Sequence, residues 1–365
     1  MIDRYKNAGI TGVFSEWAKY QRWSLIEAIV YLHAEGGNNI HKRDVIRDFN
    51  PTPERIAEVE QTTRHDVQAY LVCLEEHLKC SELDMSGVHT RLTSSDLVDT
   101  GMALAVKDAM TILTDRVAQL LQQYQLMAQA QAETILDGRT HGRVALPITG
   151  EERWKRMLVD IQMWERDLKP LKGKLGGPVG SSFNLVEVEA CAMMLRTELE
   201  TGLARQCLSR HAVHRLSQHL AYLAGVLENH ATNLRLWMIE GVEEYRINRS
   251  PGYVGSSSMP FKNNPTDLER VCGLARLVRG YNLAISESCS LWHERDISHS
   301  CVERVAIEDM FHCLMQMVKD LFGVMASLEP VEYQPRSLAN VQKVEEANRQ
   351  AASGSRAEAW ESAEI

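Results

Sequence analysis

The sequence has no uncharged apolar run of about 18 residues or more, the length that a bilayer-spanning helix needs. Its start, MIDRYKNAGI, lacks the basic-then-apolar order of a secretory signal. The eight cysteines are scattered and form no CxxC pair, which argues against a disulfide framework or a zinc site. We therefore expect a cytoplasmic protein with reduced, mostly buried thiols and no bound metal or cofactor.

Positive charge is also in deficit. The 365 residues include 40 Lys and Arg against 49 Asp and Glu, a net charge of −9. Such a chain repels phosphates, so a nucleic-acid partner is not expected. If the substrate is an anion, the cations that hold it must cluster locally. The hydrophobic content of 44% is typical of a globular protein.

Proline is absent from three long spans, 54–146, 179–250 and 266–329. Because proline breaks helix interiors, these spans permit long helices. In two of them apolar residues recur at alternating spacings of four and three, with His230 filling one gap: Val106, Met110, Leu113, Val117, Leu120, Tyr124 and Met127, then Leu216, Leu220, Leu223, Leu227, Leu234 and Trp237. Alternating apolar and polar runs are nearly absent. The pattern predicts an all-α protein whose long helices pack in a bundle or across subunits.

Glycine and proline gather in three interruptions, which we interpret as loops: 137–150, 172–182 and 250–265. The predicted organisation is an N-terminal helical domain (1–100), a central long-helix bundle domain (101–330) and a C-terminal segment (331–365). The composition of that last segment is typical of a short polar helix or a frayed tail.

The segment 250–265, which we call the serine loop, combines three consecutive serines with Gly255, Lys262 and Asn264. Backbone N–H groups, hydroxyls and one cation are what an oxyanion or carboxylate needs. By composition alone, an ordinary surface loop with helix-capping serines is the favoured interpretation.

Two other polar segments could carry chemistry. In the first, His141 lies between Thr140 and a glycine, and histidine is the commonest general acid or base near neutral pH. In the second, Arg295, Ser300 and Arg304 form a set suited to phosphate or carboxylate recognition. Each could also be a solvated, structural segment.

These segments together carry a resemblance. GSSSMPFKNNP (255–265) resembles the GSSxMPxKxNP signature of the fumarase/aspartase superfamily, and His89 with Thr93-Ser94-Ser95-Asp96 and the GRTHG segment (138–142) resemble its two other conserved regions. Within the superfamily, MIDRY (1–5), TRHDV (63–67) and ERDISHS (294–300) are similar to the adenylosuccinate lyase family. The resemblance covers residues 1 to about 330.

The resemblance implies an anti β-elimination that releases fumarate from a succinylated purine nucleotide. It implies Ser256 as general base, with Ser257 as the alternative, His141 as general acid, and Lys262 and Asn264 holding the succinyl carboxylates. It also implies a homotetramer in which three subunits contribute to each active site. The remaining substrate-binding positions that it implies are Arg4, Tyr5, Arg64, His65, Asp66, His89, Thr93, Ser94, Thr140, Gln206, Arg270, Arg295, Ser300 and Arg304.

The sequence departs from the family pattern in places. Arg91 stands where glycine is usual, and the third, C-terminal helical domain is expected to be missing or short, although Gly354–Trp360 resembles one of its helices. Two alternatives stay open: a lyase of this superfamily with another leaving group, such as a modified purine nucleotide or argininosuccinate, and a noncatalytic homologue. The noncatalytic alternative predicts loss of Ser256, His141 or Lys262, and all three are present.

Overall fold

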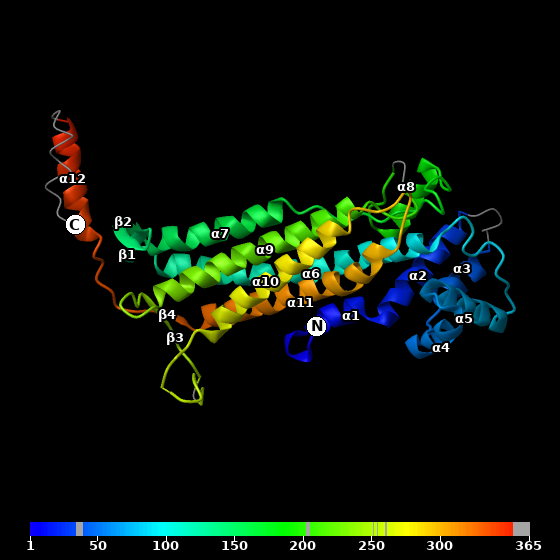
Figure 1. Cartoon of the computed structure of the whole chain (residues 1–365), viewed down its shortest axis with the longest axis horizontal. Helices are drawn as coiled ribbons and strands as arrows, with labels where there is room; N and C mark the ends of the chain where they lie inside the picture. The colour runs from blue at the N-terminus through cyan, green and yellow to red at the C-terminus, as the bar shows by residue number, and fades with distance from the viewer. Residues whose placement is uncertain (34–38, 202–204, 251, 254, 260, 353–365) are drawn as a thin grey trace. The chain divides into compact units, whose positions relative to one another are not determined.

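The computed structural model describes residues 1–33, 39–201, 205–250, 252–253, 255–259 and 261–352. Helices make up most of that part of the chain (Figure 1), so the predicted all-α fold class is confirmed. They are η1 (Asp3–Tyr5), a 3-10 helix, and the α-helices α1 (Ala8–Phe14), α2 (Glu16–Tyr31), α3 (Ile40–Arg47), α4 (Pro53–Thr63), α5 (Asp66–Cys80), α6 (Ser94–Ala130), α7 (Gly150–Arg166), α8 (Leu185–Leu195), α9 (Arg210–Trp237), α10 (Thr266–Glu287), α11 (Ser298–Ala326) and α12 (Leu338–Ala352). None of these helices is both long and apolar enough to cross a bilayer.

The chain divides into two compact units, each built from three segments. Unit 1 comprises Met1–Arg116, Asp167–Gly225 and Gly273–Met317, and unit 2 comprises Val117–Arg166, Val226–Cys272 and Val318–Ile365. The division of the sequence at residues 100 and 330 stays a prediction.

Unit 1 has its apolar core around α2, α5 and the start of α6. Trp23 lies edge-on to Tyr20 and Tyr70, with ring centroids 5.4 and 5.5 Å apart. The Tyr70 hydroxyl is 3.0 Å from Ser24 Oγ, so the buried phenol keeps a hydrogen-bond partner. Most residues in the second half of α2 are buried and apolar. Glu27 is the charged exception among them, and it is only 1% exposed.

The predicted apolar stripes are the buried faces of α6 and α9. All the predicted α6 positions from Val106 to Tyr124 are buried, as are the predicted α9 leucines from Leu216 to Leu234 and His230. Tyr124 Oη lies 3.2 Å from His230 Nδ1, and burial lowers the pKa of His230 to about 4, so the ring makes this hydrogen bond in its neutral form. The predictions of long helices in the proline-free spans are confirmed.

Polar contacts join the other long helices within each unit. In unit 1, Ser217 on α9 donates to Asn282 on α10 over 2.8 Å, and the Tyr281 hydroxyl donates to Asp309 on α11 over 2.8 Å. In unit 2, the Arg270 guanidinium on α10 makes a bidentate pair with Asp320 on α11, at 2.7 and 2.8 Å.

The segment 137–150 is not the loop that its glycines predicted. Strands β1 (Ile135–Thr140) and β2 (Arg143–Thr149) pair antiparallel, and Thr140 faces Arg143 across a two-residue turn. Both turn residues, His141 and Gly142, have positive φ, at 52° and 75°. Two such residues make the tight turn whose twist matches a hairpin. A second small sheet pairs β3 (Tyr245–Ile247) with β4 (Leu328–Pro330).

The prediction that most of the cysteines are buried is confirmed, and the helix alternative for the tail is the one seen up to residue 352. All eight cysteines are free thiols, and five of them are buried. Helix α12 is the polar helix expected after residue 331. The Gly354–Trp360 helix that the resemblance predicted lies outside the described residues.

Candidate active site

The serine loop leads from β3 to α10 in unit 2, and its described part folds back on itself. Asn264 Nδ2 donates to the Gly255 carbonyl over 3.1 Å. A Cβ built on Gly255 would lie 1.8 Å from the Lys262 carbonyl oxygen. Because only glycine fits such a close backbone approach, residue 255 fixes the return of the loop.

Arg249 anchors the ends of the serine loop. Its guanidinium donates to Asp267 at the start of α10 over 2.7 Å and to the Asn264 carbonyl over 3.2 Å. It also lies over the Tyr253 ring, 4.4 Å from the centroid. The loop therefore has a fixed base and a polar tip.

Ser256 is half-buried at the tip, whereas Ser257 is exposed. The Met259 N–H donates to Ser256 Oγ over 3.3 Å, and Ser258 Oγ lies 3.4 Å away. A backbone N–H aimed at an oxygen favours its charged form, which is what a serine acting as a base requires. The Lys262 side chain is exposed and pairs with none of the described residues.

His141 and Thr140 lie at the tip of the β1–β2 hairpin, also in unit 2, and both are exposed. No hydrogen bond or ion pair joins the imidazole to another described residue of the chain. Arg270, by contrast, pairs with Asp320 and with Asp267, so a substrate would compete with two carboxylates for its guanidinium.

The largest group of candidates meets in unit 1, where α5, α6 and α11 begin. His65 caps α5, its Nδ1 accepting from the Gln68 N–H over 3.3 Å, and its Nε2 lies 3.4 Å from Ser94 Oγ. Arg304 on α11 donates to Asp66 over 2.8 Å. The exposed Arg64 precedes them with φ 55°. Arg304, Asp66, His65 and Ser94 thus lie together at one polar position, which begins directly after Arg64 in the sequence.

Thr93 and Ser94 are held there by the way α6 begins. Asp96, in the first turn, accepts the Thr93 N–H over 2.8 Å, the contact by which a side chain satisfies an orphan donor at a helix start. Elsewhere in unit 1, Arg295 donates to Gln206 over 3.2 Å. Ser300 lies in the first turn of α11, and among the described residues no hydrogen bond or ion pair joins Arg4 or Tyr5 of η1 to these candidates.

His89 has a partner that sequence reasoning missed. Glu27 accepts the His89 N–H over 3.0 Å, and its other oxygen lies 2.5 Å from His89 Nδ1. Burial opposes the charged imidazole, but the Glu27 carboxylate outweighs it and raises the pKa of His89. The pair fixes the ring so that Nε2 is left for a ligand. The sequence signal that could have revealed this partner is Glu27 itself, an acidic residue inside the apolar run of α2.

Arg91, the departure from the family pattern, also has a defined place. It makes a bidentate pair with Glu187 on α8, at 2.8 and 2.7 Å, and lies 4.4 Å from the centroid of the Phe183 ring. Its positive φ of 67° explains why glycine is suited to this position. Here the arginine ties the segment before α6 to the start of α8.

A buried charge cluster supports the unit 1 candidates. Arg210 pairs with Asp99 at 2.9 Å and with Glu303 at 2.8 Å, and all three are nearly inaccessible. Burial raises the pKa of Glu303 to about 7, against the opposing effect of Arg210. Burial, with help from Arg210, lowers the pKa of the neighbouring His299 to about 4. The first turns of α11 are thereby fixed.

Lys174 and Asp96 form a second buried pair, with both side chains 0% exposed and 2.9 Å between them. We expect Lys174→Met to lower the free energy of unfolding by about 3–5 kcal/mol, because it leaves a buried carboxylate without its cation. Urea unfolding followed by far-ultraviolet circular dichroism measures this loss.

Lys172→Met is the matched control. Its ammonium pairs with Glu198 at 3.2 Å, but both side chains are about half exposed, so the loss should stay below about 1 kcal/mol. Equal losses of unfolding free energy in Lys174→Met and Lys172→Met would contradict the larger contribution that we expect from the buried pair.

Known proteins resemble the chain over most of its length. A family model described as lyase matches residues 22–280. The chain is 34% identical over 335 residues to an adenylosuccinate lyase of Synechocystis sp., covering 88% of this chain and 77% of that protein. It is 33% identical over 350 residues to an adenylosuccinate lyase of Aquifex aeolicus, covering 90% and 77%.

Solved structures show the same fold. A fumarate lyase from Mesorhizobium sp. BNC1 aligns with a TM-score of 0.81 at 19% identity, covering 99% of this chain and 86% of that one. A 3-carboxy-cis,cis-muconate lactonizing enzyme from Pseudomonas putida aligns with a TM-score of 0.81 at 21% identity, covering 98% and 84%.

The chain belongs to this lyase family. Its curated relatives in the family include adenylosuccinate lyases from several bacteria and an archaeon, so the resemblance predicted from the sequence motifs is confirmed.

Proposed function

We propose that the protein is a carbon–nitrogen lyase that releases fumarate from adenylosuccinate and leaves AMP. We extend the proposal to the succinylated aminoimidazole carboxamide ribotide, which would give the enzyme two steps of purine nucleotide biosynthesis. The observation that carries it is the joint presence of the serine loop, His141 and the 295–304 segment in a chain 34% identical to an adenylosuccinate lyase.

In the proposed reaction, Ser256 as alkoxide takes a proton from the succinyl carbon next to a carboxylate. The electron pair left behind spreads into that carboxylate, and then forms the new carbon–carbon double bond as the carbon–nitrogen bond breaks. His141 gives a proton to the departing nitrogen. The products are fumarate and the free amine, and no cofactor is needed.

Charge placement supports these roles. Removal of the carbon-bound proton builds a second negative charge on the carboxylate, so positioned cations and N–H donors supply much of the rate. Lys262 is free of intrachain carboxylates among the described residues, and Asn264 lies beside the Gly255 turn. We assign both to the succinyl carboxylates.

The nucleotide would bind through the unit 1 candidates. Arg64, Arg295 and Arg304 supply local positive charge in a chain whose net charge is −9. His65 and Ser94 lie 3.4 Å apart next to the Arg304–Asp66 pair, and we assign Ser300 on α11 to the same ligand. We propose that these three arginines are the cations that an anionic substrate requires.

We further propose that the enzyme is a homotetramer whose active sites each take residues from three subunits. The long helices support it: Leu283 on α10 is 62% exposed and Val305 on α11 is 56% exposed. In the proposed tetramer a neighbouring subunit would cover such exposed apolar side chains of the long helices. A cytoplasmic location remains our prediction.

The test is to incubate purified protein with adenylosuccinate and to follow fumarate release. We expect steady turnover with equimolar AMP, and none with argininosuccinate. Turnover only with a succinylated modified purine would favour the alternative leaving group. No turnover with any succinylated amine would favour the noncatalytic homologue.

A further inference from the structure

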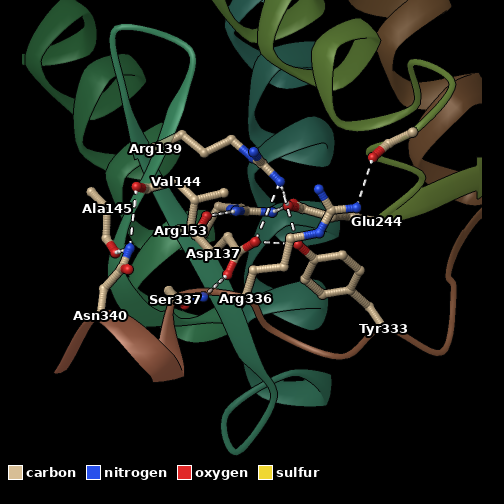
Figure 2. Close-up of polar contacts among 11 residues, drawn as sticks. Asp137, Arg139, Val144, Ala145, Arg153, Glu244, Tyr333, Arg336, Ser337 and Asn340 are labelled. Atoms are coloured by element: carbon tan, nitrogen blue, oxygen red, sulfur yellow. Dashed lines mark hydrogen bonds and ion pairs between the residues drawn. The ribbon is translucent and has the colours of Figure 1, made fainter. Parts of the chain in front are cut away.

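The hairpin that carries His141 is held by a segment nearly 200 residues later in the sequence. Asp137 on β1 is fully buried, and the Ser337 N–H donates to its Oδ1 over 2.8 Å. The Tyr333 hydroxyl donates to its Oδ2. Figure 2 shows both groups reaching Asp137 from the same stretch of chain. We call residues 333–340 the strap.

The ionisation states of this contact are well defined. Burial acts to raise the pKa of Asp137, but hydrogen bonds from Tyr333 and Ser337 outweigh it and leave the pKa lowered. Burial and the Asp137 carboxylate raise the pKa of Tyr333 to about 12. The phenol therefore keeps its proton and acts as the donor, a charge-assisted hydrogen bond of the stronger kind.

Two arginines complete the network around Asp137 (Figure 2). Arg139 lies 3.4 Å from Asp137, 3.4 Å from Glu244 and 3.3 Å from the Tyr333 hydroxyl. Arg153 on α7 donates to the Asp137 carbonyl over 2.9 Å and pairs with Glu244. Two cations and two carboxylates balance, so the buried network is electrically neutral.

The strap also reaches the second strand of the hairpin. Asn340 Nδ2 donates to the Ala145 carbonyl over 2.9 Å and lies 3.4 Å from the Val144 carbonyl. Between these contacts the hairpin is irregular, because its register shifts at Gly138, where an added Cβ would lie 2.4 Å from the Leu146 carbonyl. A bulge bends a strand and changes the direction of the residues beyond it.

A two-stranded hairpin is marginally stable by itself, so external contacts decide where its tip lies. Asp137 lies on β1, four residues before His141 in the turn, and the strap contacts both strands of the hairpin. The strap residues lie outside the 22–280 span of the family match.

We propose that the strap positions the hairpin, and through it His141, for proton transfer to the leaving nitrogen. Tyr333 and Asn340 are then positioning residues that touch no substrate. The inference rests on the proposed function for His141, but the contact between strap and hairpin can be tested without activity.

The first measurement is amide hydrogen exchange of residues 135–149 in the full chain. Tyr333→Phe keeps the ring and removes only the donor, so we expect about tenfold faster exchange in the hairpin. Arg336→Ala is the matched control: Arg336 lies in the strap, and among the described residues its guanidinium donates only to the Gly241 carbonyl, at 3.5 Å. Amide exchange in the hairpin that is unchanged in Tyr333→Phe, or equally fast in Arg336→Ala, would overturn the proposal that the strap holds the hairpin.

The second measurement is the kinetics of fumarate release. We expect Tyr333→Phe to lower kcat by about 10- to 100-fold with little change in KM, since a misplaced proton donor slows chemistry more than binding. In a His141→Ala background the same change should cost almost nothing, because the two residues act as one unit.

The outcomes separate the two hypotheses. Full additivity of the two substitutions, or an unchanged kcat with a loosened hairpin, would overturn the positioning role. A wild-type protein without lyase activity would overturn the proposed function, while the exchange measurement would still decide whether the strap holds the hairpin.

Discussion

Ser256→Ala is expected to lower kcat for fumarate release by about 10²–10⁴-fold, the usual contribution of one positioned acid–base group. KM should change little, because the hydroxyl acts on the transition state more than on the bound substrate. The removed atom is the half-buried Oγ that accepts the Met259 N–H. Steady-state kinetics with adenylosuccinate measures both constants.

Ser257→Ala is the matched control for this base assignment. Ser257 is adjacent, exposed and of the same chemistry, so its loss should leave kcat within a few-fold of the wild type. The reverse result, with Ser257→Ala inactive and Ser256→Ala active, would move the base by one residue. Full activity in both variants would show that neither serine abstracts the proton.

His141→Ala is expected to lose about 10²–10⁴-fold in kcat, because the departing nitrogen would leave without a proton. The hairpin fold should survive, since alanine removes only an exposed side chain. His41→Ala, which changes another exposed histidine on α3, should keep full activity. Equal activity of His141→Ala and wild type would contradict the acid assignment.

Mixing the two inactive variants tests whether subunits share active sites. If Ser256 and His141 of one site come from different subunits, random assortment of equal amounts leaves about one site in four with both residues intact. We therefore expect activity to return after subunit exchange between Ser256→Ala and His141→Ala. A mixture that stays inactive despite proven exchange would place both residues in one chain.

The sequence alone predicted the long helices well, because their signal is local. Proline-free spans and apolar residues spaced by three and four depend only on helix periodicity, and the stripes from Val106 to Tyr124 and from Leu216 to Leu234 are buried as predicted. The hairpin at 135–149 was missed, because His141 and Gly142 form a turn that demands positive φ at a residue other than asparagine or glycine.

What the sequence determined about this protein was its helical class, its family and the residue types of its candidate active site, since these lie in contiguous motifs. Tertiary structure decided which residues meet. Glu27 reaches His89 across 62 positions, and Tyr333 reaches Asp137 across 196. Such pairings depend on the packing of whole helices and strands, which no local pattern encodes. They determine how the side chain of a candidate general acid or substrate-binding residue is oriented.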